Sequence, residues 1–178
     1  MIRVLFSFLV LIVLSMSQGA QAVQPADSAE ASGIRTCKEK IRENTAIFLK
    51  DQPHVSHDFV APGGKRSVDK RPFLSTAFRN YSDVGLAHLS IVATRSDLSR
   101  KNVKCDMQIS ETFASERKSC EAWSLELSKQ QFEALPLAPD ITLMENKGKQ
   151  GVFSFYYLTS INDGNGCLVS RRMMAYDE

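Results

Sequence analysis

Two histidines in the first third of the chain have a spacing that could support metal chemistry. His54 and His57 stand three positions apart, with Asp51 and Asp58 beside them. A His-x-x-His pair presents both rings on one side of the chain only when the segment is helical. Pro53 permits a helix here only as a new first turn, since proline fits that position. The favoured interpretation is two exposed loop histidines. If the segment binds a metal, His54 and His57 are the candidate ligands.

A second candidate site is the segment Gln52 to Arg71, which has no apolar periodicity and contains two adjacent glycines. A loop of this length in a compact domain usually has a function or is mobile. The glycines lack the preceding strand and the spacing of a phosphate-binding loop. The segment's basic residues, together with one further along the chain, could instead attract an acidic protein partner. These candidate binding residues are Lys65, Arg66, Lys70, Arg71 and Arg79.

Signals for catalysis and for cofactors are weak. The chain has no Gly-x-Ser-x-Gly motif to position a nucleophilic serine, and no Cys-x-x-Cys pair for redox chemistry or a zinc ribbon. No other motif suggests a cofactor, so none is expected. Four glutamates on either side of Cys120 are expected to face solvent rather than to form an acid/base pair. They are Glu111, Glu116, Glu121 and Glu126.

The four cysteines predict two disulfides, because an even count behind an export signal is typical of oxidised proteins. Four cysteines allow three pairings. The favoured one joins Cys105 to Cys120 across a hairpin that turns between Ser110 and Ser115. It leaves a second bond between Cys37 and Cys167, which would tie an N-terminal helix to the C-terminal hairpin.

Residues 1–22 have the pattern of a secretory signal peptide. Arg3 provides the positive start, Val4 to Leu14 is almost continuously apolar, and Ala20-Gln21-Ala22 is a cleavage pattern of small residues. The apolar run is shorter than the roughly 20 residues of a membrane span. A periplasmic or secreted protein with no transmembrane segment after cleavage is therefore expected.

The remaining sequence predicts a disordered lead over residues 23–33 and one α+β domain over residues 34–178. The clearest element is a hairpin from Gly151 to Tyr176, in which apolar residues fall on both faces of the first strand. The Asp-Gly dipeptide between the two strands is typical of a tight hairpin turn. Another half-buried strand, Val103 to Phe113, alternates apolar and polar residues.

Two helices are expected before the strands. The first begins at Ile34 and ends near Asp51, because Pro53 cannot continue it. The second begins at Pro72 and ends at Gly85, since apolar residues recur at helical spacing. That apolar stripe consists of Phe73, Leu74, Ala77, Phe78 and Tyr81.

Three further strands complete the expected sheet: Leu86 to Thr94, Cys120 to Leu127 and Ile141 to Glu145. The middle one is ambiguous, because helical spacing also fits, and strand is favoured. The predicted fold is α+β, with two N-terminal helices packed on a mostly antiparallel meander of about five or six strands.

These observations favour a binding protein over an enzyme. The formal net charge of +2 argues against a dedicated nucleic-acid binder. The expected function is that of a small exported binding protein, for example an inhibitor or immunity-type protein, that recognises another protein through the Gln52 to Arg71 loop and nearby sheet surface. Two alternatives stay open: a cell-envelope hydrolase whose site assembles only on folding, and an envelope assembly factor.

Overall fold

The structure is a computed structural model that describes residues 23–49, 53–59, 71–81, 84–95, 104–146 and 152–176. The expected signal peptide lies outside the described residues, as do Asp51, Lys65, Arg66 and Lys70. No helix in the described ranges is long and apolar enough to cross a membrane.

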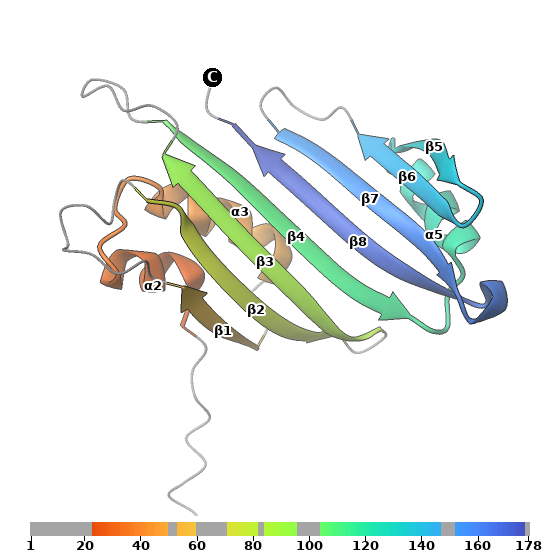
Figure 1. The fold of residues 1–178 in the computed structure, drawn as a ribbon, viewed down its shortest axis with the longest axis horizontal. Helices are drawn as coiled ribbons and strands as arrows, with labels where there is room; N and C mark the ends of the chain where they lie inside the picture. Colours follow the sequence, from red (N-terminus) through yellow and green to blue (C-terminus); the bar gives the residue numbers. More distant parts are fainter. Residues whose placement is uncertain are drawn as a thin grey trace, which may run out of the picture.

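One antiparallel sheet of eight strands forms the centre of the fold, in the order β1-β2-β3-β4-β8-β7-β6-β5 (Figure 1). The strands are β1 (His54–Phe59), β2 (Phe73–Tyr81), β3 (Gly85–Arg95), β4 (Cys105–Ser115), β5 (Glu133–Ala138), β6 (Ile141–Asn146), β7 (Val152–Ile161) and β8 (Gly166–Ala175). The predicted fold had fewer strands in a simple meander. After β4 the chain instead crosses to the far edge at β5 and returns, so that β8 pairs with β4.

Three helices are found in the described part of the chain, and all lie on one face of the sheet (Figure 1). They are α2 (Pro25–Ala31), α3 (Lys38–Leu49) and α5 (Cys120–Ser128). Side chains alternate between the two faces of a strand, so the odd-numbered residues of β4 share a face. Cys105 is bonded to the segment before α3, and Phe113 packs against Trp123 of α5. Both helices therefore cover the same side.

The buried side chains under the helices form two cores rather than one. The first lies beneath α2 and α3 and includes Phe48 and Ile109. The second lies beneath α5 and includes Phe113 and Leu158. Glu111 of β4 sits between them in sequence and is only 2% exposed, which places a carboxylate at the junction of the two cores.

The disulfides join Cys37 to Cys105 and Cys120 to Cys167, so the predicted pairing is wrong. It assumed a turn between Ser110 and Ser115, whereas that stretch continues through the end of β4. Each bond instead fastens a helix region to the sheet.

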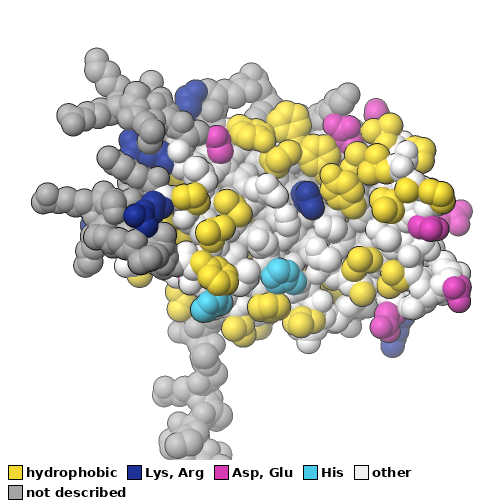
Figure 2. All heavy atoms as spheres, viewed as in Figure 1, with side chains coloured by type: hydrophobic (Ala, Val, Ile, Leu, Met, Phe, Trp, Pro, Cys, Tyr) yellow, Lys and Arg dark blue, Asp and Glu magenta, His cyan; other side chains and the backbone are white. Residues whose placement is uncertain are grey.

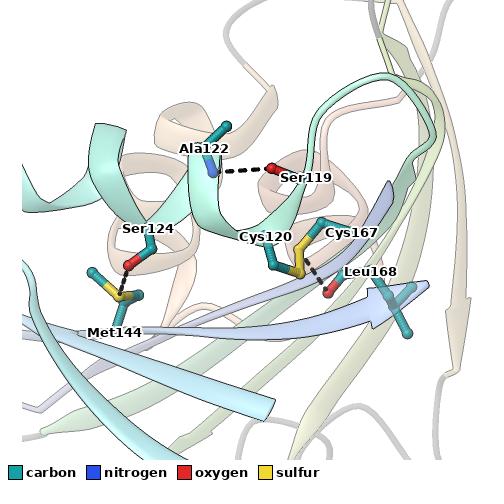
Figure 3. Close-up of a disulfide and its surroundings, with 7 residues drawn as sticks. All are labelled: Ser119, Cys120, Ala122, Ser124, Met144, Cys167 and Leu168. Carbon is teal, nitrogen blue, oxygen red and sulfur yellow. Dashed lines mark hydrogen bonds between the residues drawn. A yellow bond between two sulfur atoms is a disulfide. The ribbon is translucent and has the colours of Figure 1, made fainter. Parts of the chain in front are cut away.

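The second disulfide begins at the first residue of α5 (Figure 3). The Ser119 side chain caps that helix by accepting a hydrogen bond from the Ala122 amide at 3.2 Å. The Ser124 hydroxyl donates to the Met144 sulfur of β6 at 3.3 Å. The bond to Cys167 therefore holds α5 against the neighbouring strands at its N-terminal end.

Several predicted elements are confirmed. The hairpin forms as β7 and β8, joined by a short 3-10 turn at Asn162–Gly164. Gly164 in that turn has a φ of +90°, a conformation that glycine adopts without steric cost. The strands predicted over 86–94, 103–113 and 141–145 form as β3, β4 and β6, and the first predicted helix forms as α3.

Three local predictions are wrong. The second predicted helix is strand β2, because its apolar residues serve two faces of a strand. The segment 120–127, favoured as a strand, is helix α5, in which Trp123 and Leu127 point to the core and Leu125 is 63% exposed. The predicted disordered lead contains helix α2, which buries Ala26 and Ala29 against the first core.

Candidate functional site

The sheet face opposite the helices is the candidate functional site, and we call it the open face. It carries the even-numbered residues of β2, β3, β4 and β8, together with the odd-numbered residues of β1 and β7. Figure 2 shows hydrophobic side chains gathered in two areas of this face, with a mainly polar area between them. Large contiguous apolar areas on a protein surface are candidate contact surfaces.

The first apolar area is formed by β1, β2 and β3, and we call it the β1–β3 patch. Its members are adjacent in the strand register: Phe59 lies opposite Leu74, and Phe78 lies opposite both Val55 and His88. Val55 is 71% exposed, Phe59 51% and Phe78 41%. The Phe78 and His88 rings are 5.1 Å apart between centroids.

The second apolar area is formed by β7 and β8, and we call it the β7–β8 patch. Phe153 lies opposite Met174 and 6.2 Å from the ring of Tyr176. The Arg172 guanidinium lies 5.2 Å from the centre of the Tyr157 ring, at cation–π distance. This patch therefore combines exposed aromatic surface with one positive charge.

A stripe of hydroxyl groups separates the two patches. Ser90 pairs with Ser110 in the register, and Thr112 donates a hydrogen bond to Ser170 at 3.3 Å. A shallow hollow of about 190 Å³ adjoins this stripe, lined in part by Val92, Gln108, Met174 and Tyr176. The open face is thus an apolar–polar–apolar surface with a recess between its two patches.

The predicted binding residues divide into three groups. Lys65, Arg66 and Lys70 lie outside the described residues, so their role stays a prediction. Arg71 is exposed just before β2. Arg79 is only 5% exposed on the helix side of β2, so it cannot join the predicted surface patch, which assumed an exposed helical position.

The two candidate metal ligands do not come together. His54 and His57 lie on strand β1, where residues three apart point to opposite faces. His54 is 6% exposed under the helices, and His57 is exposed on the open face beside Phe59. Among the described residues, no group of three or more histidine, cysteine or carboxylate side chains is placed to hold a metal ion.

The helix side contains a buried polar cluster that the sequence did not reveal. Glu111 accepts a hydrogen bond from the Tyr81 hydroxyl. Arg79 donates to the Phe48 carbonyl oxygen and stacks 3.7 Å from the centre of the Tyr81 ring. Arg171, the register partner of Glu111, stacks 4.2 Å from the centre of the Phe48 ring. Glu111 was expected on a solvated face, and its burial among these cations is a correction.

The pKa of Tyr81 is raised from its ordinary value of 10.0, first by burial and then by the hydrogen bond to Glu111. Arg79 and Arg171 act in the opposite direction but do not cancel these effects. Burial also raises the pKa of Tyr156 across the cluster, against the influence of Arg171. Both phenols therefore remain neutral hydrogen-bonding groups at physiological pH.

The raised pKa of Tyr81 gives a testable pH dependence. As the pH rises above 10.0, the phenol ionises in the unfolded chain before it ionises in the folded chain, so folding loses stability. We expect the free energy of unfolding of the wild type to fall more steeply above that pH than that of Tyr81→Phe. Urea unfolding at a series of pH values measures both, and parallel curves for the two proteins would contradict this interpretation.

Searches of protein-family models, curated proteins and solved structures found no match to this chain. The two sheet faces are therefore the features from which we infer function.

Proposed function

We propose that this chain is an exported protein-binding domain that presents the open face of its sheet to a protein partner. The observation that carries the proposal is that none of the described helices covers the open face, on which large apolar side chains such as Phe59 and Phe78 are half exposed. Aromatic, methionine and arginine side chains are the residues enriched in protein interfaces, and the β7–β8 patch supplies all three kinds.

The partner is expected to be acidic around an apolar contact surface. In the sequence, residues 60–71 stand between Phe59, the last residue of β1, and the start of β2. It contains four basic residues against one acidic residue. Arg172 adds a positive charge within the open face. Carboxylates on the partner would be attracted to these groups, which would raise the association rate and help to set the orientation.

Export supports this function by providing the oxidising compartment in which disulfides persist. Both bonds fasten helix regions to the other face, so they stabilise the domain while leaving the open face available. Periplasmic or secreted location is part of the proposal, on the signal-like sequence of residues 1–22 and the two disulfides.

The test compares apolar side chains of similar exposure on the two faces. Phe78→Ser alters the open face, where the side chain is 41% exposed, and Ile47→Ser alters α3, where the side chain is 43% exposed. Each tagged protein is used to capture partners from a periplasmic or culture-fluid extract, and captured proteins are identified by mass spectrometry.

We expect the wild type and Ile47→Ser to capture one acidic partner. Phe78→Ser should capture at least about tenfold less of it, because an anchoring side chain in an interface contributes about 1–2 kcal/mol or more to binding. Capture should also weaken as salt concentration rises. Equal capture by the two variants would exclude the open face as the binding surface, and sedimentation of the purified chain as a dimer would indicate a second copy as the occupant.

A further inference from the structure

A cavity of about 160 Å³ lies on the helix side, on the face away from the proposed protein-binding surface. Five of its seven lining residues belong to the second core or pack against it. Its walls are aromatic, with Tyr81, Phe113, Trp123 and Tyr156, and its polar groups are Glu111 and Arg171. An engineered apolar cavity of roughly this size binds benzene, so one small ring or branched chain fits such a volume.

Two buried hydrogen-bond donors at this cavity have no partner among the described residues. They are the indole Nε1 of Trp123 and the Nε of Arg171. Unsatisfied buried donors are uncommon because each costs about 1–3 kcal/mol. A ligand that accepts hydrogen bonds would remove this cost when it enters the cavity.

Both donors are fixed in place by their neighbours. The Arg171 guanidinium lies over the Phe48 ring, with its central carbon 4.2 Å from the ring centre. The Trp123 ring is held between the Lys118 ammonium, 3.8 Å from its centre, and Phe113, 5.6 Å away. Groups that are held before binding lose little entropy when a ligand arrives.

The charges around the cavity favour an anion. Two guanidinium groups, Arg79 and Arg171, lie near Tyr81 together with one carboxylate, Glu111, which already accepts a hydrogen bond from the Tyr81 hydroxyl. The Lys118 ammonium is paired with the Glu126 carboxylate, so these two charges cancel. The cluster therefore retains one positive charge that a monoanionic ligand would neutralise.

We propose that this cavity binds a small organic carboxylate whose apolar body is one ring or one short branched chain. The carboxylate accepts hydrogen bonds from Arg171 and Trp123, and the apolar body packs against the rings of Tyr81, Phe113 and Tyr156. This is a second binding activity, separate from protein recognition on the open face.

Trp123 makes the test direct, because it is the single tryptophan in the chain and its emission reports on this cavity. The probes are cyclohexanecarboxylate and its neutral analogue cyclohexanecarboxamide, titrated into the full-length oxidised protein. We expect the carboxylate to change the emission to saturation, and the carboxamide to bind at least about tenfold more weakly. Equal binding of the two probes, or no saturable change with the carboxylate, would overturn the proposal.

A pair of adjacent arginines provides the matched control. Arg171 lies at the cavity, whereas Arg172 lies on the open face. We expect Arg171→Met to weaken carboxylate binding at least about tenfold and Arg172→Met to leave it unchanged, with circular dichroism confirming that both are folded. Equal affinity of the two variants for the carboxylate would contradict the assigned site. If Arg171→Met does not fold, the comparison of the two probes on the wild type still tests the proposal.

Discussion

Replacing Cys37 and Cys105 together by alanine is expected to lower the free energy of unfolding by about 4 kcal/mol. The bond closes a segment of 68 residues, and a cross-link of that length removes a corresponding amount of entropy from the unfolded chain. The melting temperature should fall by about 8–16 °C, at about 2–4 °C for each kcal/mol in a chain of this size. Urea unfolding and thermal melting of the oxidised proteins measure the two quantities.

The other disulfide provides the comparison, because Cys120 and Cys167 close a segment of 47 residues and should contribute a similar amount. The two substitutions should destabilise different parts of the protein. Hydrogen exchange should accelerate in α3 when Cys37 and Cys105 are removed, and in α5 when the second pair is removed. Peptide mapping that finds Cys37 joined to Cys167 would contradict the architecture.

A second large loss of stability is expected when Glu111 is replaced by leucine. Glu111 is 2% exposed and Arg79 is 5% exposed, and Arg171 lies opposite the carboxylate in the register. Without the carboxylate, the buried Arg79 and the half-buried Arg171 lose the negative charge of their cluster, and the loss of a buried acceptor costs about 1–3 kcal/mol. The Tyr81 hydroxyl also loses the acceptor of its hydrogen bond. Chemical denaturation monitored by circular dichroism measures the change.

Two further variants isolate the cause of this loss. Glu116→Leu makes the same substitution at an exposed position and should change stability by no more than about 0.5 kcal/mol. Adding Arg171→Met to Glu111→Leu should recover part of the loss, because one of the uncompensated charges is then removed. The account would be wrong if Glu111→Leu were as stable as the wild type.

Elements with one regular period could be predicted from the sequence. The strand containing Cys105, Met107 and Ile109 alternates cleanly, and the C-terminal hairpin carries a strong turn signal between apolar strands. Prediction failed where the apolar spacing of a segment fits both a strand and a helix. In β2, Phe73 and Ala77 face the helices while Leu74 and Phe78 face outward, and this spacing also matches a helical stripe.

The topology and the buried cluster depend on long-range pairing that a single sequence does not contain. Nothing local indicates that β8 returns to β4, which is what brings Arg171 opposite Glu111. For the same reason the disulfide pairing could not be chosen correctly from spacing. The open face exists because β2 is a strand, whereas the spacing of Leu74 and Phe78 predicts a helix.

Photocrosslinking tests the central claim, that the open face receives a protein partner, most directly. A photoreactive phenylalanine derivative is placed at Phe78 on the open face and, in a second protein, at Leu125 on α5, where the side chains are 41% and 63% exposed. After irradiation in the expressing cells, we expect the partner to be crosslinked from position 78 and not from position 125. Crosslinking from position 125 alone would contradict the claim.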